Sequence, residues 1–318
     1  MSNLYKVSSN PHVRDNNTTT SIMLDVIIAL IPATIFGVYN AGENALHAAL
    51  LILVCVGSAV LFEFIFQKGM KQTVTISDMS AAVTGLLLAL NLPSTFPIWM
   101  ATIGSAFAII VIKQLYGGIG QNFMNPALGA RCFLVLSFGV RMTTFVYDGV
   151  TGPTPLAVLK TNGEVDSVKE MFIGTIGGTI GETSVIALLI GASYLLIKKV
   201  IDFRIPFFYI LSFSIFIVLF GDKTFDFGYL LTHLCGGGLI LGAFFMATDY
   251  VTSPITPVGR IVFGIIIGIL TAIFRIFGPS AEGVSFAIIF GNLLVPLIDK
   301  VTRPRPFGYK NMKKKEEK

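Results

Sequence analysis

Charged residues are scarce in this chain. Only 13% of its 318 residues are Asp, Glu, Lys or Arg, whereas 53% are hydrophobic. Soluble globular proteins carry about 25% charged residues, so this chain has roughly half the charge that a water-exposed surface needs. The composition therefore excludes a soluble enzyme and predicts a membrane protein. The net charge is +5, but the basic residues lie between apolar runs or in the C-terminal tail, so we expect no nucleic-acid partner.

Cysteine and histidine are also scarce. Each of them stands alone in the sequence, at positions Cys55, Cys132, Cys235, His12, His47 and His233. Zinc and iron-sulfur sites need clustered ligands, such as the Cys-x-x-Cys spacing, which these positions do not offer. We expect no metal site, so any redox chemistry needs an organic cofactor or a neighbouring subunit. The polar N-terminal segment does not have the pattern of a cleaved signal peptide.

Long apolar runs, in contrast, are plentiful. A helix that crosses a bilayer uses about 20 apolar residues, and a spanning backbone in lipid must be a helix or a closed barrel. The runs fall at about 21–39, 46–66, 77–92, 97–115, 124–140, 183–198, 205–221, 229–247, 257–277 and 284–299. Because these runs lack strict alternation, the sequence predicts an all-α membrane protein with about ten transmembrane helices.

The basic residues predict an orientation, because short cytoplasmic loops retain Lys and Arg. With the N-terminus in the cytoplasm, most of the 23 basic residues fall on the cytoplasmic side. The exceptions are Arg141, Lys160, Lys169, Lys223 and Arg275. We therefore expect both termini in the cytoplasm and the long loop 141–182 on the outer side of the cytoplasmic (inner) membrane of a prokaryote.

The long loop divides the predicted helices into two groups of five. An odd number of crossings inverts the second group relative to the first, as in many transporters. Helices three and eight both end at a polar break, near Asn91 and near Thr248, which predicts two inverted repeats with broken helices. The expected divisions are an N-terminal cytoplasmic segment 1–20, a first repeat 21–140, an outer loop 141–182, a second repeat 183–299 and a basic tail 300–318.

The outer loop contains a Pro-rich motif. It reads Asp148-Gly-Val-Thr151-Gly152-Pro153-Thr154-Pro155. Each proline fixes its own φ and disfavours helix in the residue before it, so Thr154 is expected to be extended between two rings. We expect the Thr154 hydroxyl at an accessible bend, where an enzyme can modify it. By these physical arguments alone, a plain surface turn is the favoured interpretation.

The same motif resembles a known modification site. Asp148-x-x-Thr151-Gly152-x-Thr154 is similar to the motif at which a flavin transferase esterifies the last Thr with the phosphate of FMN; Pro153 replaces the usual Ala. The chain as a whole resembles the family that includes the D-type membrane component of the Rnf complex and the B-type component of the sodium-pumping NADH:quinone reductase. The stretches that carry this resemblance are 9–12, 116–131 and 247–254. The length favours the Rnf component.

This resemblance implies a function. It implies covalent FMN on Thr154, with Asp148, Thr151, Gly152 and Pro155 completing the motif, and a second, noncovalent flavin, riboflavin, within the membrane domain. The implied partners are the other Rnf subunits, the flavin transferase and membrane lipid. The complex would pass electrons between ferredoxin and NAD, coupled to sodium or proton transport. The alternative is a stand-alone, urea-channel-like transporter of a small polar solute.

Further candidates lie near the predicted breaks. The glycines of 116–120 do not follow a strand, so a dinucleotide-binding loop is rejected. Asn122 and Asn125 either cap the fifth predicted helix or contact a flavin, and both interpretations stay open. Arg131 is a possible flavin contact as well. Asp249, at the broken end of helix eight, is the candidate for an ion-sensitive residue.

Charges inside the apolar runs need partners. Asp25 and Glu63 are expected near the cytoplasmic boundary, with Glu63 close to Lys68 in sequence. Arg131 is expected to be compensated by Glu63 or Asp78, or to face a phosphate or an electron-transfer partner.

Overall fold

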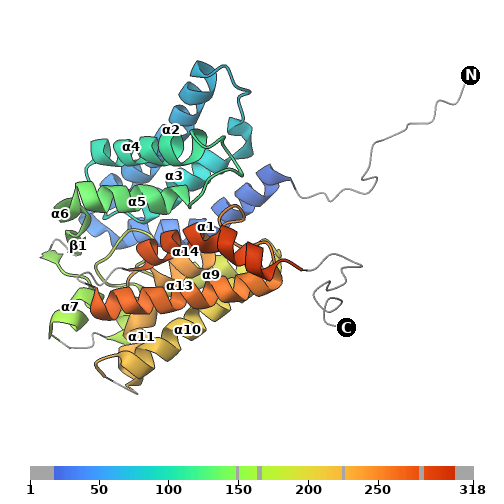
Figure 1. Ribbon diagram of the computed structural model, residues 1–318. Coiled ribbons are helices and arrows are strands. Elements are labelled where there is room, and N and C mark those ends of the chain that lie inside the picture. The colour runs from blue at the N-terminus through green and yellow to red at the C-terminus, as the bar shows by residue number, and fades with distance from the viewer. Residues whose placement is uncertain (1–17, 148–149, 163–166, 224–225, 279–282, 305–318) are drawn as a thin grey trace, which may run out of the picture.

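The computed structural model describes residues 18–147, 150–162, 167–223, 226–278 and 283–304. Asp148 and most of the predicted terminal segments lie outside these ranges. Within them the chain is mostly helical, with one short hairpin. Figure 1 shows α7 and β1 at one end of the helical bundle, and the start of α1 and the last turn of α14 at the other.

The described part of the first half, from residue 18 on, contains six α-helices. In chain order its elements are α1 (Thr19–Asn40), η1 (Gly42–Asn44), α2 (Ala45–Gly69), η2 (Ile76–Asp78), α3 (Ser80–Leu90), α4 (Ile98–Ala106), η3 (Phe107–Gln114), α5 (Pro126–Ser137) and α6 (Gly139–Met142). Thr18 begins α1 in a capping box with Ser21, which satisfies amides that have no partner in the first turn. The segment η3 is a π-helix that continues directly from α4.

The second half follows a hairpin. Its elements are β1 (Phe145–Tyr147), β2 (Val150–Gly152), α7 (Pro155–Asn162), α8 (Val168–Ile173), α9 (Val185–Ile197), α10 (Arg204–Phe220), α11 (Phe227–Cys235), α12 (Leu239–Leu241), the π-helix η4 (Gly242–Met246), α13 (Pro257–Phe277) and α14 (Val284–Thr302). The two halves pack closely where α1 meets α9, because a Cβ on Gly191 would collide with the Ala29 carbonyl oxygen.

Several helices are suited to a membrane. Among the described residues, four are long and apolar enough to cross one: 19–40, 42–69, 257–277 and 284–302. The pair 227–235 and 239–246, bent by 60°, could be a fifth. Shorter apolar helices occupy 80–90, 98–114, 126–137, 185–197 and 204–220. These helices support a multi-pass membrane protein, whereas the count of ten and the inverted repeat stay predictions.

The break after the third predicted helix is formed by protein contacts. The helix α3 ends at Leu90, and the next residues run beside the segment before α9. Pro93 forms an antiparallel bridge with Thr179, and the Gly181 amide donates to the Leu90 carbonyl at 2.8 Å. Exposed backbone groups are costly in lipid, so this pairing lets the chain leave the helix inside the bundle.

The eighth predicted helix has an additional break that was not predicted. Its predicted end is close to the end of η4 at Met246, but the segment also turns at Gly236, Gly237 and Gly238 between α11 and α12. Gly237 and Gly238 have φ of 64° and 66°, a conformation that glycine adopts without steric cost. The three consecutive glycines within an apolar run were the sequence feature that could have predicted this break.

Candidate functional site

Thr154 lies at the start of α7, directly after the β1–β2 hairpin. Its Oγ1 accepts the Ala157 amide at 3.3 Å, and its carbonyl accepts the Val158 amide at 3.0 Å. Thr154 therefore caps α7, with Pro155 at the first helical position, where a missing amide costs nothing. Thr151 pairs with Val146 in the hairpin. Asp148, the first residue of the motif, lies outside the described residues.

The predicted accessibility of Thr154 is wrong. Thr151 and Gly152 are exposed, but Thr154 is only 6% exposed. The cause is the helix that follows: Leu156 and Leu159 are buried, and their contacts hold the first turn of α7 against the bundle. The two prolines predict an exposed bend, whereas Pro155 begins a docked helix.

A first cavity of about 90 Å³ brings together three of the predicted residues, Asn122, Asn125 and Asp249. Its other polar lining residues are Ser80, Thr84, Lys113, Thr248 and Tyr250. Thr154 and Arg131 do not line this cavity. The structure thus places these three residues together and separates them from Thr154 at the start of α7 and from Arg131, which contacts Ser285.

Asn125 caps helix α5. Capping was one of the two interpretations that the sequence left open. Its Oδ1 accepts the Ala127 amide at 3.0 Å and the Leu128 amide at 3.3 Å, and its Nδ2 donates to the Met246 carbonyl at 3.2 Å. The cap also links α5 to the end of η4. Asn122 donates to the Met124 carbonyl at 3.5 Å. Flavin contact by either residue stays a prediction.

Asp249 is half-buried and organises the turn after η4. Its Oδ2 accepts the Thr252 hydroxyl at 3.0 Å, and its Oδ1 accepts the Val251 amide at 3.5 Å. Both contacts are local, within three residues. A role in ion sensitivity therefore stays a prediction.

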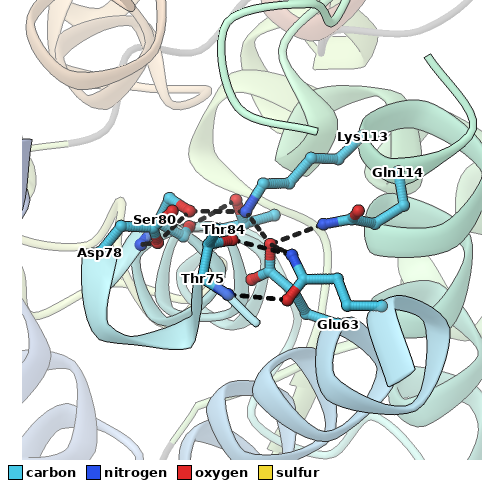
Figure 2. Close-up of polar contacts among 8 residues, drawn as sticks. Glu63, Thr75, Asp78, Ser80, Thr84, Lys113 and Gln114 are labelled. Carbon is cyan, nitrogen blue, oxygen red and sulfur yellow. Dashed lines mark hydrogen bonds and ion pairs between the residues drawn. The ribbon is translucent and has the colours of Figure 1, made fainter. Parts of the chain in front are cut away.

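Figure 2 shows a cluster of polar side chains, most of them buried. The Lys113 ammonium is 2.8 Å from Glu63 Oε1 and donates to Ser80 Oγ at 2.6 Å, while Gln114 donates to the same Glu63 oxygen at 2.6 Å. The side chains of Lys113 and Glu63 are 4% and 1% exposed. Asp78 Oδ1 accepts the Ser80 hydroxyl at 2.6 Å. We call Glu63, Asp78, Ser80, Lys113 and Gln114 the Lys113 cluster.

The ion-pair partner of Glu63 is not Lys68, its neighbour in sequence, whereas its expected place near the membrane boundary stays a prediction. Glu63 is buried, and its cation is Lys113, fifty residues further along the chain. Lys113 and Gln114 are consecutive residues of the π-helical η3, and both reach Glu63. Among the described residues, Glu63 Oε2 has no hydrogen-bond partner. Since Lys113 and Ser80 also line the first cavity, this cavity has a charged wall.

Two buried arginines complete the polar interior. Arg131, predicted to pair with Glu63 or Asp78, instead donates to the Ser285 hydroxyl of α14. Arg275, in the last turn of α13, donates to the carbonyls of His233, Gly236 and Gly237, where α11 ends. We call Arg275 and these three carbonyls the Arg275 cluster. No role was predicted for Arg275, although a charge within an apolar run was a visible signal.

The chain consists of apolar helices that enclose charged clusters and broken segments. This arrangement is typical of polytopic membrane proteins with polar sites between their helices. Within this class the chain belongs to the NQR2, RnfD, RnfE family, whose model matches residues 6–308.

The relatives cover almost the full chain. The D-type component of the Na(+)-translocating ferredoxin:NAD(+) oxidoreductase complex of Acetobacterium woodii is 46% identical, over 97% of this chain and 96% of the relative. The D-type component of the proton-translocating ferredoxin:NAD(+) oxidoreductase complex of Clostridium ljungdahlii is 42% identical, over 96% and 97%. The D-type component of the ion-translocating oxidoreductase complex of Yersinia enterocolitica is 34% identical, over 96% and 98%.

Proposed function

We propose that this chain is the D-type membrane component of an ion-translocating oxidoreductase complex, which passes electrons between ferredoxin and NAD partners. The similarity to components of this name over nearly the whole length carries the proposal. The partners would be the other subunits of the complex, membrane lipid and a flavin transferase. Since one relative is named for sodium and another for protons, the transported ion is either of these.

We propose that Thr154 carries FMN as a phosphoester. The local structure fits this group: the Ala157 amide points at Thr154 Oγ1, and the start of a helix favours a negatively charged phosphate. FMN, when attached, supplies one- and two-electron exchange. Thr154 acts as an anchor, and α7 holds that anchor against the bundle.

The resemblance also implies noncovalent riboflavin in the membrane domain. The first cavity does not fit it, because about 90 Å³ is well below the roughly 300 Å³ of small ligand pockets. We therefore propose that the membrane domain binds this second flavin, and we assign it to no site.

A denaturing gel tests the attachment. The chain, produced together with a flavin transferase and viewed under ultraviolet light, should give a fluorescent band that is lost in Thr154→Ala. Thr161→Ala is the matched control, because Thr161 is an exposed threonine on the same helix, and its band should remain. A dark wild-type band with an active transferase would refute the attachment and favour the alternative, a stand-alone transporter of a small polar solute.

We propose a cytoplasmic-membrane location with both termini in the cytoplasm and the Thr154 loop outside. This orientation fits Figure 1, in which α7 lies at one end of the bundle, and the start of α1 and the last turn of α14 lie at the other end. A cysteine in place of the exposed Thr161 should react with a membrane-impermeant thiol reagent in intact cells. Reaction only after lysis would reverse the orientation.

Asp249 is proposed as an ion-sensitive residue because it lines the first cavity. Asp249→Asn should weaken the ion dependence of electron transfer in the complex while the fluorescent band remains. Unchanged ion dependence would remove Asp249 and leave Glu63, whose Oε2 has no partner among the described residues and whose ion-pair partner Lys113 lines the cavity, as the next candidate.

A further inference from the structure

The burial of Thr154 conflicts with its modification. A transferase must surround the hydroxyl that it modifies, but Thr154 is 6% exposed and its Oγ1 accepts the Ala157 amide. The preceding residues Thr151 and Gly152 are exposed, so the obstruction comes from the docking of α7.

One part of the docking is apolar. Leu156 is 2% exposed and packs over the break between α11 and α12. A Cβ on Gly237 would lie 2.8 Å from Leu156 Cδ2, and one on Gly236 would lie 3.6 Å from Leu156 Cβ. The first turn of α7 therefore rests directly on the broken helix.

The other part of the docking is a single cation at the far end of α7. The Lys160 ammonium donates to the Arg275 carbonyl at 2.9 Å and to the Gly278 carbonyl. These are carbonyls at the C-terminus of α13 that have no partner within the helix, and a cation there is favoured by the helix dipole. Lys160 thus joins the Thr154 helix to the end of α13.

Between these two attachments the packing is incomplete. A second cavity of about 180 Å³ lies there, and its lining residues include Leu156, Leu159, Lys160, Asp222, His233 and Arg275. His233 is 6% exposed, and neither ring nitrogen has a hydrogen-bond partner among the described residues. A void forfeits the contacts that would fill it, so the hydrogen bonds of the exposed Lys160 add to the docking that the buried Leu156 and Leu159 provide.

We propose that Lys160 is a positioning residue for the modification of Thr154, an inference that rests on the proposed attachment of FMN there. Its ammonium latches α7 onto α13, the latch must open for the transferase to reach Thr154, and it closes afterwards to hold the attached flavin in one place. Loss of the latch then speeds the modification and loosens the attached flavin, whereas general damage to the fold would slow the modification.

The transfer itself needs an activated donor, a flavin dinucleotide. The Thr154 oxygen forms a bond to the phosphorus on the flavin side, the phosphoanhydride bond breaks, and the adenosine monophosphate leaves with the electron pair. The hydroxyl proton goes to a base of the transferase or to water. No electron is gained or lost in this step, and Lys160 takes no part in it.

Thiol labelling tests the latch without any flavin. In Thr154→Cys, Lys160→Met should raise the rate of maleimide labelling at position 154 about tenfold, the equilibrium factor of one charge-assisted hydrogen bond. Met keeps the length of the side chain and removes only the ammonium. Lys169→Met is the matched control, since Lys169 is an exposed lysine of the same loop, and it should leave the rate unchanged. Protein without the new cysteine gives the background from the three buried native cysteines.

Three labelling results would overturn the proposal: an unchanged rate in Lys160→Met, an equal rise in Lys169→Met, or a Thr154→Cys thiol that already reacts as fast as one at position 161. Lys160→Gln is the second variant, because its amide can still donate to a carbonyl, and its labelling rate should lie between those of wild type and Met.

Flavin transfer gives an independent measurement. The purified unmodified chain, flavin transferase and flavin adenine dinucleotide should yield the fluorescent band several times faster with Lys160→Met than with wild type, and the attached flavin should show lower fluorescence anisotropy. A slower transfer, or an unchanged anisotropy, would contradict the latch. A dark wild-type band instead refutes the attachment to Thr154, and the thiol experiment still decides whether Lys160 latches α7.

Discussion

Lys113 and Arg275 occupy comparable places near opposite ends of the bundle and are held in different ways. Each lies in the last turn of a long apolar helical segment, and they are 3% and 2% exposed. Lys113 is bound by the carboxylate of Glu63, whereas Arg275 is bound by three main-chain carbonyls. Contacts to a buried cation thus come from a carboxylate in the first case, and from the carbonyls at the end of a broken helix and the Phe213 ring in the second.

The two solutions suit different tasks. A carboxylate partner can exchange one cation for another, and two members of the Lys113 cluster, Ser80 and Lys113, line the first cavity. Backbone carbonyls cannot be released without unfolding the break, so Arg275 braces α11 where its last carbonyls lack helical partners. We infer that the first cluster is adjustable and the second is a fixed support for α7.

Lys113→Met should have the largest effect on stability. It leaves the Glu63 carboxylate buried without its cation, and breaking a buried ion pair in this way costs about 3–5 kcal/mol. We expect the melting temperature of the detergent-solubilised protein to fall by on the order of 10 °C, measured as loss of the monodisperse gel-filtration peak after heating.

The double variant Glu63→Gln with Lys113→Met is the control for charge. Because it removes both charges, it should recover most of the lost melting temperature. A double variant as unstable as Lys113→Met alone would show that packing, and not charge compensation, accounts for the loss.

Arg275→Met should have a smaller effect, about 2–3 kcal/mol, because its side chain donates to three carbonyls and hydrogen bonds to a charged group contribute roughly that amount. Removing His233 as well should give no recovery, since His233 contributes its carbonyl and not its side chain. Melting temperatures of Arg275→Met, His233→Ala and the double variant test this. Recovery in the double variant would mean that Arg275 is compensated like Lys113.

Gly237→Ala tests the same support from the backbone side. Gly237 has φ of 64°, and a Cβ there would lie 2.7 Å from Arg275 Nη2. An L-residue in this conformation costs about 1–2 kcal/mol, and the contact with the guanidinium adds to this cost unless the guanidinium shifts. Gly42→Ala is the matched control, because Gly42 has φ of 54° with nothing near its Cβ. Equal losses of melting temperature would mean that the contacts with Arg275 and Leu156 add nothing.

The apolar helices were predictable from the sequence because lipid demands long apolar segments and internal hydrogen bonding. The predicted ends near Asn91 and after Met246 match α3 and η4 for the same reason: a Pro or polar residue stops an apolar helix. The cap at Asn125 was also predictable, since Asn followed by Pro is a strong local signal.

The charge pairing was not predictable, because it depends on which helices meet. Sequence proximity favours Lys68 for Glu63, whereas its partner comes from a helix fifty residues away and is placed by a π-helical segment. The burial of Thr154 was unpredictable for a similar reason: the docking of α7 depends on α11 and α13, which local proline geometry does not report. Local rules thus located the candidate residues, and only tertiary packing located their partners.

Asp202→Asn should have the smallest effect and gives the reference for an ion pair at the surface. Asp202 precedes α10, and its Oδ2 lies 2.6 Å from Arg260 and 3.2 Å from Arg204. Partial burial alone would raise its pKa, but hydrogen bonds from the Arg204 amide and the Arg260 side chain, together with the two positive charges, lower the pKa below its ordinary value.

A lowered pKa in the folded state means that the carboxylate stabilises the protein above the unfolded pKa of about 3.9 and loses this contribution as the pH falls through the folded value. At neutral pH we expect Asp202→Asn to cost under about 1 kcal/mol, since partly exposed ion pairs contribute little, and this small loss should vanish in acid. Melting temperatures at pH 7 and near pH 3 measure both. A loss as large as that of Lys113→Met would show that burial is not what separates the Lys113 pair from a surface pair.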